Sequence, residues 1–196
     1  MSKAEVTKAH IVRQAAELFN LKGYAGASMA DIMQATGLKK GGIYNHFASK
    51  EDLAIAAFDR AVALVSQKVW QAIKTKRNAL ERLDALVCTY LIHINEPPIA
   101  GGCPILNTAV EMDDTNSPLR DRTLAAMNKW RSLIVRIVQK GIKKGEVNPK
   151  TDPDLVATLI ISNIEGALMM TKLERNPVHL QRAITHLQTY IQQLAV

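Results

Sequence analysis

The spacing of apolar residues constrains the fold of this chain more than any other feature of its sequence. Apolar residues recur at intervals of three and four along the whole chain, which is the period of an amphipathic α-helix. Runs of β-branched residues with the alternating pattern of a half-buried strand are absent, and all seven prolines lie at or beyond Pro97. We therefore expect an all-α protein.

Size and charge narrow the class of protein. The chain has 196 residues, 47% hydrophobic and 22% charged, which is enough apolar material for one or two folded domains. Its 25 lysines and arginines exceed its 18 aspartates and glutamates, and the net charge of +7 suits a nucleic acid or another polyanion as partner. Two cysteines, Cys88 and Cys103, are too few for a disulfide framework, so we expect a cytoplasmic protein.

No segment is expected to be exported or to cross a membrane. Charged residues lie within the first ten positions, where a secretory signal needs an apolar stretch. The longest apolar tract, residues 155–170, is interrupted by polar side chains and is shorter than the roughly 20 residues of a spanning helix. We therefore expect no membrane partner.

Local start and stop signals divide the chain into a group of short N-terminal helices and a longer C-terminal part. Ser28 stands three residues before Asp31, which is the spacing of a capping box, and Gly37 is suited to end the helix that begins there. A further cap at Ser49 starts a long helix that bridges the two parts. Two domains are expected, residues 1–52 and residues 53–196.

The two short helices joined by a turn at Gly37 have the spacing of a helix-turn-helix, whose second helix enters the DNA major groove. That helix is expected over residues 39–47, anchored by Ile43 and Phe47. Residues 1–50 carry seven basic and three acidic side chains, so +4 of the net charge of +7 lies here. Taken alone, the Lys-Lys-Gly-Gly stretch also fits a solvated turn. The candidate DNA-binding residues are Ser28, Lys39, Lys40, Gly41, Gly42, Tyr44, Asn45, His46 and Lys50.

Several segments occur in an order that is found in a known family. They are Gly23-Tyr24, Ser28-Met29-Ala30-Asp31-Ile32, Ala35-Thr36-Gly37-Leu38, Gly42-Ile43-Tyr44-Asn45-His46-Phe47 and Ser49-Lys50-Glu51-Asp52-Leu53. Through them the N-terminal region resembles the tetracycline-repressor (TetR) family of bacterial transcription regulators.

The resemblance implies which candidates contact DNA. Backbone contacts are implied for Tyr44, His46 and Lys50, and positions near bases for Lys40, Gly41 and Asn45. Lys39 stands where the family often has a capping Ser or Thr, so the start of the helix and the separate roles of Lys39 and Lys40 stay open.

The last two helices are candidates for a dimer interface. In the final helix Leu180, Ile184, Leu187, Ile191 and Leu194 follow the 4-3-4-3 spacing of a coiled-coil seam. The helix before it is apolar nearly all round, and Gly166 and Ala167 would permit close approach. The resemblance favours pairing of both helices with their symmetry mates in a homodimer, and the alternative is an intramolecular core.

The resemblance also implies a pocket for a small-molecule effector in the C-terminal part. Ordinary core packing is the alternative for each of its candidates. Cys103 stands at an expected helix N-terminus, which favours a thiolate, so a reactive or oxidant-sensing cysteine is one hypothesis and a structural cysteine the other. The candidate ligand-binding residues are Tyr90, His93, Cys103, Asn107, Met112, Met127, Trp130 and Met169.

Sequence motifs of catalysis are missing. The chain has no His-Glu-x-x-His helix, Gly-x-Ser-x-Gly elbow, phosphate-binding loop or Cys-x-x-Cys pair, so we expect no enzyme, cofactor or metal. Glu111, Asp113 and Asp114 are interpreted as a solvated helix end. With the resemblance, the expected function is a repressor that binds a palindromic operator as a homodimer and is released by a small-molecule inducer. A basic helical module without sequence preference is the alternative.

Overall fold

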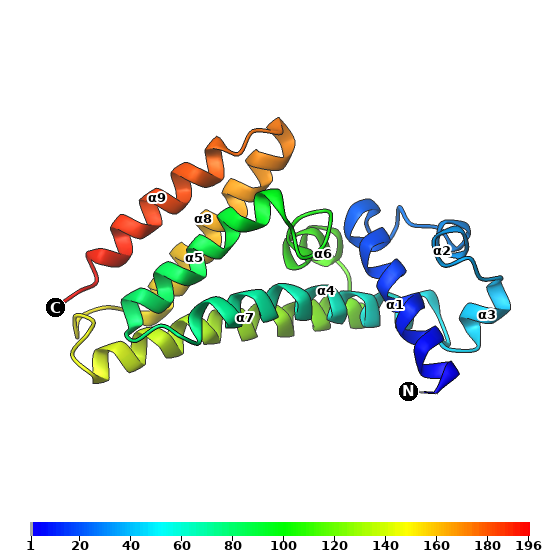
Figure 1. Cartoon of the computed structure of the whole chain (residues 1–196), viewed down its shortest axis with the longest axis horizontal. Coiled ribbons are helices and arrows are strands. Elements are labelled where there is room, and N and C mark those ends of the chain that lie inside the picture. The colour runs from blue at the N-terminus through cyan, green and yellow to red at the C-terminus, as the bar shows by residue number, and fades with distance from the viewer. Residues whose placement is uncertain (1) are drawn as a thin grey trace. The chain divides into compact units, whose positions relative to one another are not determined.

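A computed structural model describes residues 2–196, apart from the side chains of His93 and Asn95. Within this range the regular structure is entirely α-helical, which confirms the expected fold class. The helices are α1 (Lys3–Lys22), α2 (Met29–Thr36), α3 (Lys40–Tyr44), α4 (Lys50–Ile73), α5 (Ala79–Asn95), α6 (Pro104–Met112), α7 (Pro118–Lys143), α8 (Pro153–Glu174) and α9 (Val178–Gln192) (Figure 1).

The chain packs into two compact units. The first contains Met1–Val65 and Ile99–Ala126, and the second contains Ser66–Pro98 and Met127–Val196. The long helices α4 and α7 contribute residues to both units. The first unit extends beyond the expected domain of residues 1–52 because α6 returns to pack against α1. The functional boundary near residue 52 stays a prediction.

Capping side chains set the ends of the N-terminal helices where the sequence predicts them. At the start of α2 the Ser28 hydroxyl accepts a hydrogen bond from the Asp31 N–H at 3.1 Å, and the Asp31 carboxylate accepts from the Ser28 N–H at 2.8 Å. Gly37 ends α2 in the left-handed conformation with a φ of 69°. Ser49 accepts from the Asp52 N–H at 3.0 Å and caps α4. These ends depend on local chemistry alone.

The second helix of the helix-turn-helix is shorter than the expected residues 39–47. It covers Lys40–Tyr44, and Asn45 and His46 form a turn after it. Two adjacent glycines have low helix propensity, and the Ser49 cap starts a new helix only a few residues later. The chain therefore has room for little more than one turn of helix here.

The core of the first unit is small and lies among α1, α2, α3 and α4. Its members come from the positions that the helical spacing places on one face of each helix. The largest fully buried side chains there are Ile11, Ile32, Ile43 and Leu53.

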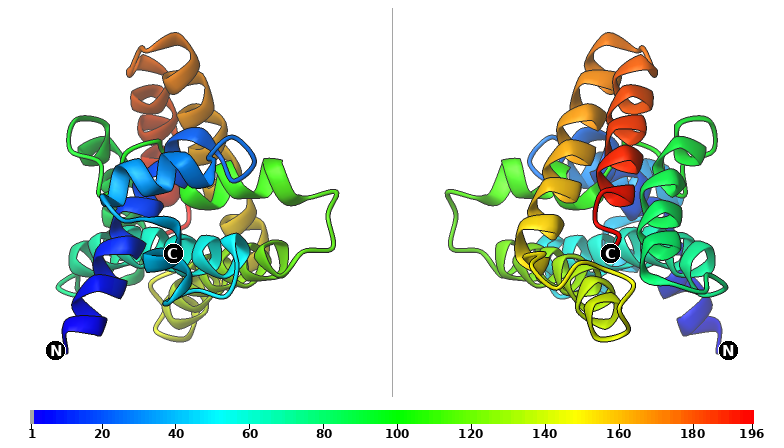
Figure 2. Two further views of the ribbon diagram at one scale, coloured as in Figure 1. Left: turned by 90° about the vertical axis from the view of Figure 1, so that its right-hand side faces the viewer. Right: turned by 90° about the vertical axis from the view of Figure 1, so that its left-hand side faces the viewer.

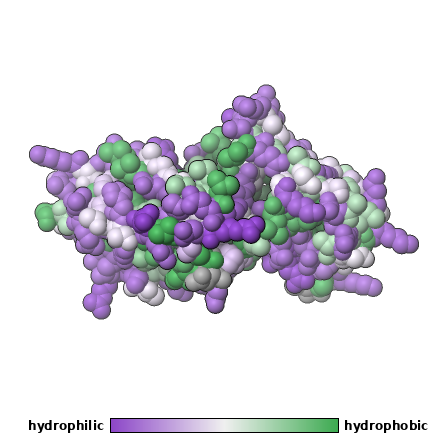
Figure 3. All heavy atoms as spheres, turned by 90° about the horizontal axis from the view of Figure 1, so that it is seen from above, coloured by the Kyte–Doolittle hydropathy of each residue, from purple (hydrophilic) through white to green (hydrophobic). Residues whose placement is uncertain are grey.

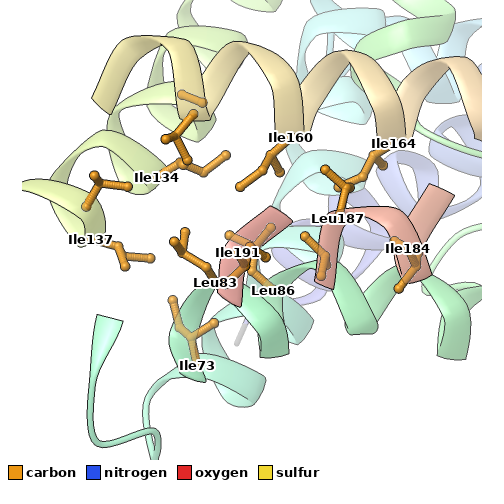
Figure 4. Close-up of a cluster of buried hydrophobic side chains, with 14 of the residues drawn as sticks. Ile73, Leu83, Leu86, Ile134, Ile137, Ile160, Ile164, Ile184, Leu187 and Ile191 are labelled. Carbon is orange, nitrogen blue, oxygen red and sulfur yellow. The ribbon is translucent and has the colours of Figure 1, made fainter. Parts of the chain in front are cut away.

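The core of the second unit is larger and is formed by α5, α7, α8 and α9. Isoleucine and leucine side chains from these helices point toward one another (Figure 4). The seam of α9 that begins at Leu180 lies inside this core, and α9 runs beside α8 in both views of Figure 2. That seam is therefore intramolecular, which is the alternative that the sequence left open. Ala167 is buried as well, whereas a Cβ on Gly166 would meet open space.

The outer face of α8 carries several exposed apolar side chains. Leu155, Met169 and Leu173 are 52%, 57% and 83% exposed, and they are three of the exposed large hydrophobic side chains of the chain. Patches of apolar surface among polar side chains are visible in the space-filling view (Figure 3).

By length and composition α8 is the one helix of the described residues that could span a bilayer. The sequence expectation that the apolar tract is too short to do so is corrected here. This alone is weak evidence, because a core helix of a soluble protein passes the same test.

Candidate nucleic-acid interface

The segment of residues 39–47, which contains α3, buries some of its side chains and exposes others. Ile43 and Phe47 are 1% and 6% exposed and pack in the core of the first unit. Most of the predicted DNA-binding residues in this segment are accessible. Lys39, Lys40, Gly41, Tyr44 and Asn45 are exposed, while Gly42 and His46 are half-buried. Seven of the nine candidates thus lie on one short segment, as their positions in the sequence require, and their contacts with DNA stay predictions.

The start of α3 has no side-chain cap. Lys39 occupies the N-cap position in an extended conformation and makes no capping hydrogen bond, in agreement with its replacement of the usual Ser or Thr. The Lys40 ammonium lies 5.7 Å from the centroid of the Tyr44 ring, so these two side chains share a face. Both lysines are exposed, and their separate roles at bases or phosphates stay open.

The glycines of α3 are not required by contacts within the chain. A Cβ on Gly41 would meet nothing within 4 Å, and one on Gly42 would lie 3.7 Å from the Leu38 Cβ, which is ordinary van der Waals contact. The space that Gly41 leaves open therefore faces outward, where a partner could approach the backbone.

Ser28 has a structural task at the start of α2. Its hydroxyl donates to Asp31 Oδ2 at 2.6 Å, and Lys22 Nζ binds the other carboxylate oxygen at 2.7 Å. The hydrogen bond from Lys22, followed by those from Ser28, holds the pKa of Asp31 well below its usual range. Ser28 is exposed, so its contact with DNA stays a prediction.

Lys50 has a partner within the chain. Its ammonium donates to the Tyr24 carbonyl oxygen at 2.6 Å and lies 4.4 Å from the centroid of the Tyr24 ring. Burial, followed by the carboxylates of Glu51 and Glu111, raises the pKa of the Tyr24 hydroxyl. A phosphate contact, as the sequence predicts for Lys50, would use the donors of the ammonium that remain.

Glu111 is not part of a solvated helix end, so that interpretation is wrong for this residue. Its two carboxylate oxygens accept hydrogen bonds from the backbone N–H groups of Tyr24 and Ala25, at 2.7 and 2.6 Å. The partners lie 87 and 86 residues away in the sequence, so no local pattern could identify them. Asp113 and Asp114, the other two acids of this cluster, are exposed.

The predicted effector-binding residues are divided between the two units. Tyr90 and Trp130 stack in the second unit with ring centroids 5.9 Å apart, and the buried Trp130 Nε1 has no hydrogen-bond partner within the described part of the chain. Met127 is half-buried there and Met169 is exposed. The side chain of His93 lies outside the described residues. Cys103, Asn107 and Met112 belong to the first unit.

A pocket in the first unit is too small for an effector in this conformation. It has a volume of about 30 Å³ and lies among α1, α4 and α6, with Asn107, Asn20 and Glu111 at its polar side. That volume accommodates about one water molecule, whereas sites for small molecules occupy about 300–1,000 Å³. Of the described residues, no group of three His, Cys, Asp or Glu side chains could hold a metal ion.

Two family models match the chain on either side of its middle. Residues 11–57 match the model of bacterial regulatory proteins of the tetR family, and residues 79–187 match that of the tetracyclin repressor-like C-terminal domain.

Solved structures and a curated relative agree with these models. A TetR transcriptional regulator from Chloroflexus aurantiacus J-10-FL is 46% identical, with a TM-score of 0.95, and the match covers 100% of this chain and 98% of that one. A TetR-family regulator from Cytophaga hutchinsonii is 33% identical, with a TM-score of 0.92 and the same two coverages. The HTH-type transcriptional repressor DhaR of Mycobacterium sp. (strain GP1) is 27% identical, over 90% of this chain and 87% of its own length.

Proposed function

The chain belongs to the TetR family of DNA-binding transcriptional regulators, and we propose that it is a homodimeric repressor that binds a palindromic operator and is released by a small-molecule effector. Its relatives are named as transcriptional regulators, which is a non-enzymatic role. Its place of action is then the cytoplasm.

The accessible side of α3 carries the DNA-binding part of the proposal. Cations and hydrogen-bonding groups are supplied there by Lys39, Lys40, Tyr44 and Asn45. Ile43 is buried in the core of the first unit and anchors the helix. Cations bind phosphates in a salt-dependent way, and polar side chains of a recognition helix read base edges in the major groove. This combination on one anchored helix supports sequence-specific binding to duplex DNA.

The apolar face of α8 supports the homodimer. Leu155, Leu159, Ser162, Gly166, Met169 and Leu173 follow each other at intervals of four and three, and none of them is fully buried within the chain. Small residues in the middle of this seam permit close approach of a second helix, and the flanking leucines and methionine supply area to bury. Two copies related by a two-fold axis would present two recognition helices to the half-sites of a palindrome, about 34 Å apart.

An electrophile or oxidant at Cys103 is the effector chemistry that the loop before α6 favours. Cys103 is the N-cap residue of α6, and the Asn20 side chain donates to the carbonyls of Ala100 and Gly102, at 2.6 and 3.0 Å. A bulky group on Cys103 would therefore disturb a loop that is bonded to α1. The chain's second cysteine, Cys88, is less suited to this chemistry. Burial, followed by the Asp84 carboxylate, raises the pKa of the Cys88 thiol and so lowers its reactivity.

Treatment with N-ethylmaleimide tests the role of Cys103. The thiolate adds to the alkene carbon of the reagent and the neighbouring carbon takes up a proton. After treatment, the native chain and a Cys88→Ser variant should both lose operator affinity, because both keep Cys103. A treated Cys103→Ser variant should keep its affinity. Equal loss in both variants would refute the sensor role and leave a structural cysteine.

Selection of duplexes from a random DNA pool tests the proposed function as a whole. The purified chain should enrich an inverted repeat whose half-site centres are about 10 base pairs apart or a multiple of that spacing. Enrichment of single half-sites would remove the dimeric operator from the proposal. Retention of DNA without any enriched sequence would identify a basic helical module instead.

A further inference from the structure

The carboxylate of Glu111 binds the turn between α1 and α2. Each of its oxygens accepts one backbone N–H, from Tyr24 at 2.7 Å and from Ala25 at 2.6 Å. Gly23, which ends α1 with a φ of 78°, favours this approach, because a Cβ there would lie 3.0 Å from Glu111 Oε2, which is tighter than ordinary van der Waals contact. Hydrogen bonds from backbone amides to an ionised carboxylate are among the stronger ones in proteins.

Lys50 binds the same turn from the other side. Its ammonium donates to the Tyr24 carbonyl oxygen at 2.6 Å. That carbonyl and the Ala25 N–H belong to a single peptide group, so this group lies between a cation from α4 and an anion from α6. Each charge polarises the peptide in the direction that strengthens the bond to the other.

A second side chain of α6 holds the same end of α1. Asn107, one helical turn before Glu111, donates to the Asn20 backbone oxygen at 3.2 Å and to its Oδ1 at 3.1 Å. Residues four apart lie on one face of a helix, so this face of α6 is bonded to the end of α1 and to the turn that follows. Figure 1 shows α6 beside the last turns of α1.

We propose that Glu111 is a positioning residue for operator binding, which acts by holding the Tyr24–Ala25 peptide and, through it, the Lys50 ammonium at the start of α4. The inference rests on the proposed DNA-binding function. An ammonium that is already held in place binds a phosphate at a lower cost in side-chain entropy than a free one does.

A double-mutant cycle with Glu111→Ala and Lys50→Ala tests the coupling on the selected operator duplex. Glu111→Ala should lower affinity by about threefold to tenfold, which corresponds to the cost of immobilising one flexible side chain. Lys50→Ala should lower affinity and reduce the salt slope by about one. In the Lys50→Ala background the Glu111 substitution should have no further effect. A further loss there would mean that Glu111 acts on the fold of the turn alone, and would overturn the proposal.

Two further variants separate the positioning role of Glu111 from a general effect of negative charge. Asp114→Ala removes one acidic charge from the exposed end that follows α6 and should leave affinity unchanged or slightly raised. Glu111→Gln keeps one acceptor oxygen and should lie between the native chain and Glu111→Ala. If Asp114→Ala lowers affinity as much as Glu111→Ala does, the effect is not specific to this carboxylate and the proposal fails.

Amide hydrogen exchange without DNA tests the bonded turn independently of function. The Tyr24 and Ala25 amides should exchange at least several times faster in Glu111→Ala than in the native chain, and the Ala25 amide should also exchange faster in Lys50→Ala. If the native chain binds no DNA but the amides respond in this way, the DNA-binding function fails while the bonded turn stands. Unchanged exchange in both variants would overturn the positioning role even with intact operator binding.

Discussion

The side-chain amide of Asn107 donates hydrogen bonds to both the backbone oxygen and the Oδ1 of Asn20, and a third to the Gly101 carbonyl at 2.9 Å. One residue of α6 thus joins the end of α1 to the loop that precedes its own helix. The sequence assigned Asn107 to effector binding, and the structure gives it this structural role within the first unit.

Substitutions of Asn107 should destabilise the fold, and the loss should be larger for aspartate than for alanine, because neither keeps the side-chain donor and aspartate adds a negative charge. Asn107→Ala should lower the free energy of unfolding by about 1–3 kcal/mol, because the acceptors around it lose their partner. Asn107→Asp should cost more at neutral pH, since it places a carboxylate against three oxygens. Urea unfolding measures both, with the exposed loop substitution Asn116→Ala as the control. An aspartate variant as stable as the native chain would contradict the assigned donors.

The roles of Lys39 and Lys40 at the start of α3 should be distinguishable by the salt dependence and the sequence preference of DNA binding. A lysine that binds phosphate should, when changed to alanine, weaken binding to all sequences and reduce the salt slope by about one. A lysine that reads a base should instead relax the sequence preference at one position of the operator, by about 1–3 kcal/mol. We expect each of Lys39→Ala and Lys40→Ala to produce one of these effects. Lys143→Ala, an exposed lysine of the other unit, is the control. Two variants with native affinity and slope would remove α3 from the interface.

Gly41→Ala should separate stability from DNA binding. The added Cβ meets nothing within 4 Å in the chain, and alanine is favoured over glycine in a helix by about 0.5–1 kcal/mol, so the fold should be as stable as before or more stable. Operator affinity should fall, because the methyl group occupies space that faces the DNA. Thermal unfolding and operator binding on the same preparation measure the two effects. Full affinity in this variant would show that the backbone of α3 does not approach DNA closely.

The exposed seam of α8 should be sensitive to charge. Met169→Glu places two carboxylates near each other across the proposed two-fold axis and should convert dimers to monomers with little effect on the fold, because Met169 is 57% exposed in the chain. Sedimentation velocity measures the association state. Gln181→Glu adds the same charge to the exposed face of α9 and should leave the dimer intact. If only Gln181→Glu dissociates the dimer, the interface lies on α9.

The Asp31 carboxylate should make the N-terminal helices sensitive to acid. Because Lys22 and Ser28 hold its pKa below the ordinary value of 3.8, the folded chain favours the ionised form. Its stabilising contribution is complete above pH 3.8 and is lost as the pH falls further toward the folded-state pKa. The difference in urea midpoint between the native chain and Asp31→Asn should therefore be largest near neutral pH and shrink below pH 3.8. A difference that is constant or grows on acidification would contradict this ion pair and cap.

The sequence predicts features that depend on residues close together in the chain, and it misses contacts between residues far apart in it. The ends of α2 and α4 were predictable, because Ser28, Gly37 and Ser49 act on neighbours within a few residues. Periodicity identified the apolar face of α9, but it could not distinguish a partner in the same chain from one in a second copy. The contacts of Glu111 and Asn107 span more than 80 residues, and no spacing rule connects positions that far apart.

We infer that α3 presents a surface that recognises a particular duplex sequence. The most direct measurement is the ratio of affinities of the native chain for the selected operator and for a scrambled duplex of equal length, at physiological salt. We expect a ratio of about 10³ or more, which is typical of specific DNA-binding proteins. A ratio near one, with the same steep salt dependence for both duplexes, would contradict it.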